Sequence, residues 1–444
     1  MTDIVSQFFS ENFYSGFRIT QIGFDQSGSI IIQLEPPEDY PECPHCHARC
    51  TVVNQYRKRV VRDSSILCKK VILEVVYRTL RCTHCNRVGT EKIDFLSDNG
   101  FRVSRRLEME VIEGLERAGS IKDTSERTGL KWDNCKDIHK YYLKSSLYFD
   151  LGDASILAID EFSIRRGHIY ATVVIDIRTR RVIWVGYGKS VAQVSDFFKK
   201  CGTEGCKQLK AVAMDQNAGF AKCVEKYCPN AKVVYDQFHL ISNFGRMVIS
   251  AIRIRLSNQC EENGNKDAAS LLKGSRFLLL TRNSRLPDNR RTKLDDILKF
   301  YTDLNKANEL KELLPEIFQS TSKEEAEKLW STWYKLASES NVEEITKFAE
   351  TQNENYKDGI TNAGIYHIGT SVLEGINNKI KAIKRVAFGF RDFDYFFLRI
   401  MDAFRGSRLL LKLKSTDEYC YILFSAFNKF AEEPKCISVT GITT

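Results

Sequence analysis

The hydrophobic positions change their spacing along the chain, and each change predicts a different kind of secondary structure. In the first hundred residues they fall in short runs, such as 30–34 and 71–77, which predict β-strands. From residue 104 they recur every three or four residues, which predicts amphipathic helices. The N-terminal part is therefore expected to be a β-rich region followed by a helical one.

Three short helices are predicted between residues 104 and 145. Ser104 is a suitable N-cap for the first helix, which Gly119 ends, and the second covers 120–128. Gly129 begins a tight turn, and the third helix covers 132–143. Three short helices with a glycine turn before the last one are typical of a helix-turn-helix.

The pattern beyond residue 155 predicts a mixed sheet. Three strand-like runs joined by short turns come first, and helices and strands then alternate. This order is typical of an α/β domain with helices on the faces of a mixed sheet. A charged segment rich in Leu, Lys and Glu follows and predicts further helices, as does the sequence from residue 371. The expected strands are 156–160, 168–175, 181–187, 209–214 and 231–235, and the expected helices between them are 191–199 and 217–227.

Size and composition narrow the class of protein. The 444 residues suffice for about two to four domains. A hydrophobic fraction of 43%, with 11% aromatic residues, excludes a wholly disordered chain. No apolar run approaches the ~20 residues of a membrane span, and residues 1–10 lack the pattern of a secretory signal. We therefore expect a cytoplasmic protein without a membrane partner.

The net charge of +9 decides little until its distribution is considered. Residues 49–144 contain 21 Lys and Arg against 13 Asp and Glu, a net charge of +8. Residues 377–414 contain 10 against 3, a net of +7, whereas residues 301–358 contain 7 against 13, a net of −6. Two basic blocks separated by an acidic one suggest contacts with a polyanion at two places.

Four of the 14 cysteines form two C-x-x-C knuckles, Cys43-Pro-His-Cys46 and Cys82-Thr-His-Cys85. Zn²⁺ takes four tetrahedral ligands, and each knuckle supplies two sulfurs from one turn. Redox dithiols are the alternative, but two pairs in a long chain without a secretory signal favour a structural zinc ribbon. Five nearby residues are not expected to be ligands: His45, His47, Cys50, Cys68 and His84.

Basic and amide side chains follow the third predicted helix. Such side chains suit contacts to phosphates and base edges, so the helix is expected to bind DNA. An ordinary helical bundle with solvated lysines is the alternative, which the neighbouring zinc ribbon makes less attractive. The candidate DNA contacts are Lys131, Trp132, Asn134, Lys136 and Lys140.

Two aspartates each follow an apolar strand. Asp160 ends the run 156–160, and Asp215 follows the run that ends at Met214. A carboxylate at the end of a buried strand is costly without a partner, although either one alone could cap the next helix. If the strands are neighbours, both carboxylates project into one crevice. Carboxylate oxygens suit Mg²⁺, and two such ions ~4 Å apart can clamp a phosphoryl displacement.

The best third acid is Glu374. On a helix it shares one face with amide and basic side chains, and three isoleucines share another face, which we expect to be buried. An acid beside phosphate-binding groups suits a nuclease-like site, whereas a solvated face with an incidental Glu is the alternative. The polar face holds Glu374, Asn378, Lys381 and Arg385, and the apolar face holds Ile376, Ile380 and Ile383.

Four segments of the chain together resemble the ISL3 family of bacterial insertion-sequence transposases, which pairs a zinc finger and a helix-turn-helix with a DDE catalytic domain. The last segment is the most specific, the knuckles reinforce it, and the resemblance covers nearly the whole chain. The segments are 156–163 around Asp160, 212–215, Val234–His239, and Glu374–Arg385 with the following 388–393.

The resemblance implies a ribonuclease-H-like fold with a helical insertion before the last catalytic helix. It implies that Asp160, Asp215 and Glu374 form the triad that binds Mg²⁺ or Mn²⁺. Asp236 and His239 match a further family motif and are possible accessory residues, whereas Glu161 and Asp176 are expected to be structural or supporting. Phosphates near the site would be held by Asn378, Lys379, Lys381, Lys384 and Arg385.

The implied activity is cleavage at transposon ends followed by joining of the cut strand to target DNA. The expected partner is therefore double-stranded DNA, bound by a homodimer or larger assembly at the nucleoid, with no small-molecule substrate. Two rival functions are a transposase-derived regulator that binds DNA without cutting it and a nuclease of the same fold. The expected domains are 1–98 (strands and zinc ribbon), 99–150 (helix-turn-helix), 151–249 (first catalytic part), 250–358 (helical insertion), 359–414 (last catalytic part) and 415–444 (tail).

Overall fold

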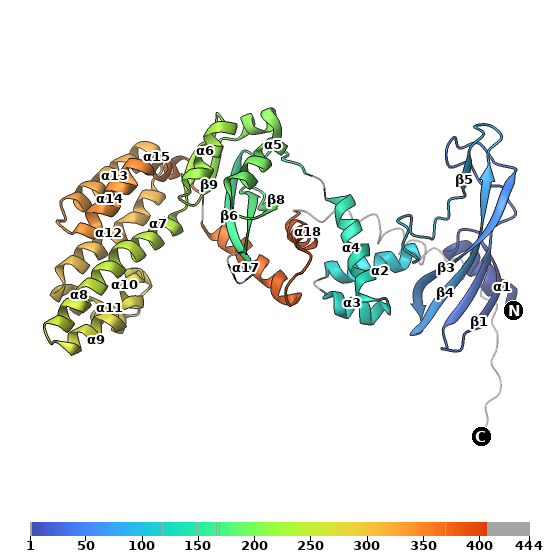
Figure 1. The fold of residues 1–444 in the computed structure, drawn as a ribbon, viewed down its shortest axis with the longest axis horizontal. Helices are drawn as coiled ribbons and strands as arrows, with labels where there is room; N and C mark the ends of the chain where they lie inside the picture. Colours follow the sequence, from blue (N-terminus) through green and yellow to red (C-terminus); the bar gives the residue numbers. More distant parts are fainter. Residues whose placement is uncertain are drawn as a thin grey trace, which may run out of the picture. The chain divides into compact units, whose positions relative to one another are not determined.

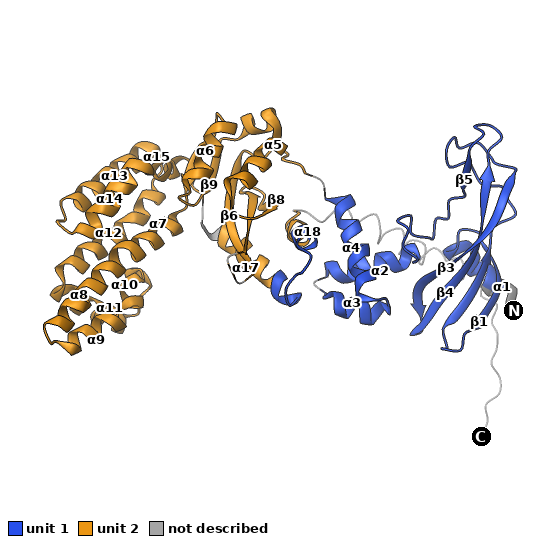
Figure 2. Cartoon of the chain, in the orientation of Figure 1, with its two compact units in different colours: residues 1–148, 383–398 blue, residues 149–382, 399–444 orange. Residues whose placement is uncertain are grey.

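The computed structural model describes residues 2–405 except residues 118, 148, 166, 168 and 369. The described residues form two compact units (Figure 2). Unit 1 takes its residues from 1–148 and 383–398, and unit 2 takes its residues from 149–382 and 399–444. The tail expected from residue 415 lies outside the described residues, and the finer domain boundaries stay a prediction.

Unit 1 opens with a helix and a five-stranded sheet (Figure 1). The strands run in the order β1-β2-β4-β3, with β5 paired to β4, and all pairs are antiparallel except β2 with β4. The two longest strands, β3 and β4, form a hairpin whose turn places Leu67 and Cys68 at positive φ. The elements are α1 (Thr2–Phe13), β1 (Arg18–Phe24), β2 (Ile30–Glu35), β3 (Val53–Ile66), β4 (Lys69–Arg81) and β5 (Val88–Thr90).

The three helices expected after residue 104 are confirmed as α2 (Arg105–Glu116), α3 (Ile121–Thr128) and α4 (Trp132–Ser146). Ser104 caps α2 by accepting the N–H of Leu107, and Ser120 caps α3 in a capping box. Gly129 adopts φ 69° at the end of α3, a left-handed conformation that costs glycine little. The helix-turn-helix arrangement therefore follows from local caps and one glycine.

A buried charge joins the sheet of unit 1 to its helices. The carboxylate of Asp63, on β3, accepts hydrogen bonds from Ser104 Oγ at 2.5 Å and Arg106 Nη2 at 2.5 Å. Tyr14 O–H adds a longer bond at 3.4 Å, and burial raises the pKa of this phenol well above its usual range. The apolar residues of the sheet and of the helices form two separate cores. The hydrogen bonds of Asp63 therefore link the sheet to the helices, each of which has its own apolar core.

A short segment from the end of the chain also packs on α4 within unit 1. Both carboxylate oxygens of Asp392 accept bonds from Lys140 Nζ, at 2.7 and 2.9 Å. Next to this pair the buried His139 contacts the hydroxyl of Tyr395 at 2.8 Å. Residues 383–398 are therefore anchored to α4, the third helix of the helix-turn-helix.

The sheet of unit 2 has five strands in the order β10-β9-β6-β7-β8. The pairs β6–β7 and β7–β8 are antiparallel, whereas β6–β9 and β9–β10 are parallel. The expected mixed sheet is thus confirmed, but β6 runs past Asp160, so the prediction that this residue ends its strand was wrong. The strands are β6 (Ile156–Arg165), β7 (Ile169–Asp176), β8 (Arg181–Tyr187), β9 (Ala211–Met214) and β10 (Lys232–Tyr235).

Helices α5 (Val191–Gln208) and α6 (Ala218–Tyr227) connect the later strands, and α5 is broken at Gly202 by a non-helical conformation. A long helical segment follows β10 and packs around Trp330 and Trp333, in the same apolar core as the sheet helices. Its elements are α7 (Gln237–Phe244), η1 (Gly245–Ile249), α8 (Ser250–Glu262), α9 (Lys266–Gly274), α10 (Arg276–Leu280), η2 (Asn283–Arg285), α11 (Asp288–Phe300), α12 (Thr302–Gln319), α13 (Lys323–Ser338), α14 (Glu343–Asn355), α15 (Lys357–Thr361) and α16 (Ala363–Tyr366).

The end of the helical segment returns to the sheet. Asn362 donates its amide to the carbonyl of Val233 on the edge strand β10 at 2.8 Å. Helices α17 (Thr370–Val386) and α18 (Phe393–Ala403) then complete the described chain. None of its helices is both long enough and apolar enough to span a membrane.

Candidate active site and zinc centre

The four knuckle cysteines meet in one cluster in unit 1. Their sulfurs lie within 4.8 Å of one another, with Cys43 Sγ 3.7 Å from Cys85 Sγ and Cys46 Sγ 3.6 Å from Cys82 Sγ. Tetrahedral zinc with Zn–S bonds near 2.3 Å requires sulfurs about 3.8 Å apart. The observed spacings agree with that value, so the cluster fits a structural zinc ion with no open coordination position.

Backbone N–H groups favour the thiolate form of Cys43 and Cys82. The N–H of Cys85 donates to Cys82 Sγ at 3.4 Å and helps to lower the pKa of that thiol to about 6. The N–H of His45 makes the equivalent bond to Cys43 Sγ. Cys50, which was not expected to be a ligand, is buried beside the cluster, where burial raises the pKa of its thiol to about 11. One further sulfur therefore lies next to the four-cysteine cluster.

Asp160 is a buried carboxylate in the middle of β6. Its Oδ1 accepts the N–H of Glu161 at 2.7 Å, and its Oδ2 accepts the side-chain amide of Asn377, on α17, at 2.6 Å. Burial raises the pKa of Asp160, the two hydrogen bonds oppose that rise, and the nearby charge of Asp215 adds to it. The side chain is only 9% exposed, so these donors replace most of its water.

Asp215 follows β9 directly and lies beside Asp160 on the sheet. The parallel register pairs Ala158 with Ala213, so two residues further along each strand the two aspartates are neighbours. This confirms that their strands are adjacent, which was the condition for a shared crevice. The two carboxylates can share a crevice if both project from the same edge of the sheet.

A histidine holds Asp215 from the opposite side. His239 Nδ1 lies 2.5 Å from Asp215 Oδ1 and 3.0 Å from Asp236 Oδ2. Burial acts to lower the pKa of His239, but its bonds to the two carboxylates outweigh that effect and raise the pKa to about 10. Asp236 also caps α7 by accepting the N–H of Phe238. The ring is therefore a cation at neutral pH and donates to Asp215.

Glu374 lies on the exposed face of α17, one helical turn before Asn377. The predicted division of this helix is confirmed for Ile376 and Ile380, which are buried, whereas Ile383 is only half-buried. The polar face is exposed at Glu374, Asn378, Lys381 and Arg385. Residues three apart on a helix share a face, about 5–6 Å apart at Cβ. The contact of Asn377 with Asp160 thus brings the turn that carries Glu374 to the sheet.

Asn377 was not predicted from the sequence. Asn378 was predicted to contact DNA because it stands at i+4 from Glu374, yet Asn378 is exposed and Asn377 makes the contact with Asp160. Asn377 Oδ1 is buried and has no hydrogen-bond partner within the described residues. A signal was available in the adjacent amides Asn377-Asn378, but the apolar pattern alone does not choose between them.

The two acidic neighbours behave as supporting groups. Asp176 is buried at the end of β7 and accepts bonds from Arg178 N–H and Thr179 O–H, which hold the turn into β8. Glu161 is half-buried, and burial raises the pKa of its carboxyl, which Lys189 opposes. Asp176 therefore stabilises the turn into β8, whereas Glu161 places a second carboxyl group next to Asp160.

The candidate DNA contacts on α4 fall into two groups. Lys131, Trp132 and Asn134 are exposed at its N-terminal end. Lys140 is instead paired with Asp392, and the Nζ of Lys136 lies 4.0 Å from the same carboxylate. The first group is available to a ligand, while the second already has partners inside unit 1.

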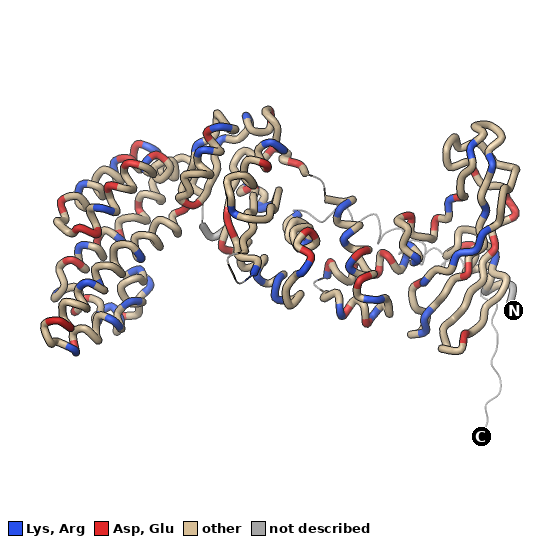
Figure 3. The backbone as a smooth tube through the Cα atoms, viewed as in Figure 1, with Lys and Arg blue, Asp and Glu red and all other residues tan. Residues whose placement is uncertain are grey.

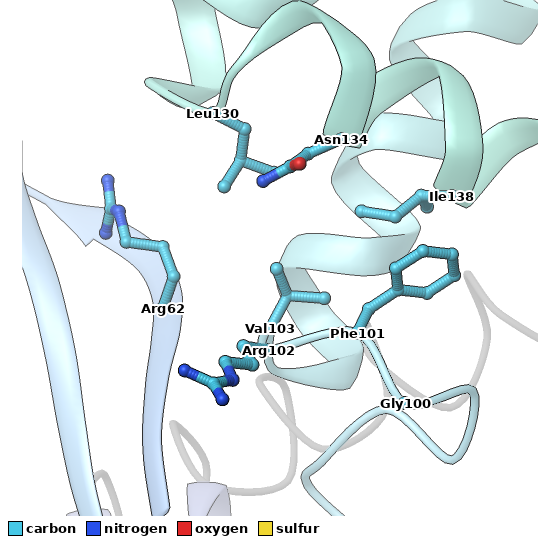
Figure 4. A pocket seen from close by; sticks show the side chains of 8 residues that line it. All are labelled: Arg62, Gly100, Phe101, Arg102, Val103, Leu130, Asn134 and Ile138. Atoms are coloured by element: carbon cyan, nitrogen blue, oxygen red, sulfur yellow. The ribbon is translucent and has the colours of Figure 1, made fainter.

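A cavity of about 330 Å³ lies beside the N-terminal end of α4 (Figure 4). The side chain of Asn134 points into it from the helix. Arg62 lines the opposite wall and donates to the carbonyls of Val71 and Thr128, which ties the β3–β4 hairpin to the helix-turn-helix. The remaining lining residues are Gly100, Phe101, Arg102, Val103, Leu130 and Ile138.

The basic residues of α17 also differ from one another. Lys381 and Arg385 are exposed, and Lys384 is half-buried. Lys379 donates to the carbonyl of Ala403 at 2.5 Å and lies over the ring of Phe404, so it holds the end of α18. Contact of these side chains with DNA stays a prediction.

Known proteins match the chain over most of its length. A family model described as "Transposase", of the ISL3 type, matches residues 157–400, more than half of the chain. A second model, described as the zinc-finger of transposase IS204/IS1001/IS1096/IS1165, matches residues 39–85. The transposase for insertion sequence element IS1001 of Bordetella parapertussis is 32% identical over 397 residues, which cover 89% of this chain and 97% of that protein. The transposase for IS1557 of Mycobacterium tuberculosis is 28% identical over 253 residues, which cover 53% and 56% of the two chains.

Proposed function

This chain belongs to the ISL3 family of transposases, and from that premise we propose that it cleaves DNA at transposon ends and joins the cut strands to target DNA. The observation that carries the proposal is the position of Asp160 on β6 and of Asp215 directly after β9, the parallel neighbour of β6, with α17 fixed to Asp160 by Asn377. In this proposal Asp160, Asp215 and Glu374 form a DDE triad.

The strand order supports a ribonuclease-H-like fold for unit 2. Three consecutive antiparallel strands, β6, β7 and β8, occupy one side of the sheet, and β9 and β10 extend it in parallel from β6. The central strand β6 then carries Asp160, and its parallel neighbour leads to Asp215. The helical segment 237–366 corresponds to the insertion before the last catalytic helix, α17.

The donor set fits hard divalent cations. Asp160, Asp215 and Glu374 offer only carboxylate oxygens, which Mg²⁺ and Mn²⁺ prefer, and these three residues would hold the ions. When bound, the ions supply an activated water or 3′-hydroxyl and stabilise the leaving oxygen of an in-line displacement. Asp215, Asp236 and His239 also offer ligand atoms within 4.8 Å of one another, so this group is a second arrangement that could hold a metal ion.

The chain's own residues organise this site before any ion binds. Asn377 and the N–H of Glu161 fix both oxygens of Asp160, so the carboxylate does not rotate freely. His239, held by Asp236, does the same for one oxygen of Asp215. Fixing the carboxylates in advance lowers the cost of organising the reactive geometry.

Unit 1 is proposed to hold the transposon end as double-stranded DNA. Its zinc ribbon and helix-turn-helix carry a basic excess, and Lys131, Trp132 and Asn134 are exposed where a recognition helix contacts base edges. Lys381 and Arg385, with Asn378, would contact phosphates near the catalytic site. Two transposon ends would require at least a dimer of the chain.

A strand-cleavage assay tests the proposal. Purified protein is incubated with end-containing DNA and Mg²⁺, and Asp160→Asn, Asp215→Asn and Glu374→Gln proteins are compared with Asn258→Ala, a change on the exposed surface of α8. The first three are expected to bind DNA without cutting it, and full cleavage by any of them removes that residue from the triad. Binding without cleavage by the unaltered chain would favour a regulator, and cleavage without joined products would favour a nuclease.

A further inference from the structure

The loop after α17 presents one phenylalanine on a rigid support. The helix ends with two backbone bonds, from Gly389 N–H to Lys384 O at 3.0 Å and from Phe388 N–H to Arg385 O at 2.9 Å. This pattern is a Schellman motif, in which the residue before Gly389 must adopt a left-handed conformation. Phe388 occupies that position with φ 51°, although glycine is the usual residue there.

The side chain of Phe388 is fully exposed. Its relative exposure is 100%, the highest among the large hydrophobic residues of the described chain. Two residues later Phe390 stacks on Phe396 with the ring centroids 4.5 Å apart, and Asp392 is held by Lys140. The loop is thus fixed on both sides of Phe388, so the backbone that carries the exposed ring loses little freedom when the ring meets a ligand.

Two unpaired cations, Arg385 and Arg391, stand three residues before and three residues after Phe388 in the described sequence. Arg385 and Arg391 are exposed, and neither guanidinium forms an ion pair within the described residues. Lys and Arg recur along α17 up to this loop (Figure 3). A protein partner would favour a broad apolar patch of several hundred Å², as is usual for docking surfaces. In this loop only Val386, at 46%, is another exposed large hydrophobic residue.

An exposed aromatic ring between cations fits a nucleic acid, because every base offers a π-face and every nucleotide a phosphate. We propose that Phe388 inserts against a base of the bound DNA and unstacks it from its neighbour, while Arg385 and Arg391 contact the flanking phosphates. Apolar side chains that enter base steps in this way kink or open the duplex. The inference rests on the proposed function, because it assigns Phe388 a role in handling the DNA that the chain cuts.

The test uses the full chain and DNA duplexes that carry 2-aminopurine at successive positions across the transposon end. The fluorescence of this base rises when it is unstacked. The buffer contains no added Mg²⁺ or Mn²⁺, so cleavage is suppressed. It contains no chelator, so zinc is not removed from the cysteine cluster. The unaltered chain is expected to raise the fluorescence at one position, and Phe388→Gly is expected to return it to the value of free duplex.

The variants separate stacking from folding. Phe388→Gly should fold normally, because glycine suits the left-handed backbone and no packing is lost. It is expected to bind end DNA about 5- to 150-fold more weakly, which is the usual range for loss of one base-stacking side chain. Phe388→Trp should keep the fluorescence rise, and Phe300→Ala, which removes another exposed phenylalanine on α11, should leave signal and affinity unchanged.

Three results would overturn the inference. One is the absence of any position whose fluorescence depends on Phe388 while DNA binding is intact. Another is an equal effect of Phe300→Ala, and the third is a change of oligomeric mass in Phe388→Gly with no change in fluorescence, which would indicate a protein interface. Cleavage of DNA without a Phe388-dependent signal would refute the inference and leave the proposed function intact. A Phe388-dependent signal without cleavage would support the inference and refute the proposed function.

Discussion

Asn377 is expected to be a positioning residue for Asp160, and its replacement gives the sharpest test of the site. The change Asn377→Ala removes the donor that lies 2.6 Å from Asp160 Oδ2 and leaves the rest of α17 in place. Alanine favours the helix, so the fold should survive the substitution. The carboxylate of Asp160 then keeps only the N–H of Glu161 as a described donor.

The size of the effect follows from the burial of the acceptor. Asp160 is 9% exposed, so water replaces the lost amide poorly. A hydrogen bond to a charged group contributes about 1.5–3 kcal/mol. Because 1.36 kcal/mol corresponds to a factor of ten, cleavage at limiting Mg²⁺ should fall by about 10- to 150-fold. The loss should shrink at saturating Mg²⁺, since the ion can then draw the carboxylate into place.

The assay measures the cleavage rate of end DNA across a series of Mg²⁺ concentrations. Asn258→Ala, an exposed amide on α8, serves as the matched control and should follow the unaltered chain throughout. Asn378→Ala should keep the same Mg²⁺ midpoint, even if its DNA affinity changes. If Asn377→Ala cuts within twofold of the unaltered chain at every Mg²⁺ concentration, then the hydrogen bond has no role in the reaction.

Three further changes test other parts of the molecule. Cys46→Ser should open the zinc cluster and expose residues 39–85 to limited proteolysis, and continued protection of that stretch would contradict a structural zinc role. Asp63→Asn removes the charge that pairs with the partly buried Arg106, so the free energy of unfolding measured in urea should fall by about 1.5–3 kcal/mol, and a loss below about 1 kcal/mol would show that this ion pair does not link the sheet to the helices. His239→Asn removes the cation beside Asp215 and should reduce cleavage at pH 7 without weakening the binding of end DNA; unchanged cleavage would mean that the ring is dispensable.

Much of the fold could be predicted because the responsible signals are local. Ser104, Ser120 and Gly129 mark helix ends through hydrogen bonds within a few residues, so the helix-turn-helix is legible in the sequence. The strand β8 was expected at 181–187 and is observed there, because its nearly continuous apolar run reflects burial within the sheet. By contrast, α1 was missed although its apolar residues recur at helical spacing, as at Ile4 and Phe8 and at Phe9 and Phe13.

The links between distant segments could not be predicted in the same way. Asp63 looks like an ordinary charged residue on a strand, and only the fold brings Arg106, Ser104 and Tyr14 to it. Lys140 likewise suggested a DNA contact because it lies on the third helix of the helix-turn-helix. The structure instead pairs it with Asp392, which is some 250 residues away. Partners this far apart leave no local trace in a single sequence.

The choice between Asn377 and Asn378 shows where the limit lies within the site itself. Successive helical residues point about 100° apart, so two adjacent amides face different surroundings although their chemistry is identical. The apolar pattern fixed the buried face at Ile376 and Ile380, and both asparagines border it. Which border faces Asp160 depends on the tilt with which α17 meets β6, a property of packing. The sequence therefore predicts the helix and a candidate acid, Glu374, whereas the hydrogen bond that fixes the carboxylate of Asp160 requires the fold.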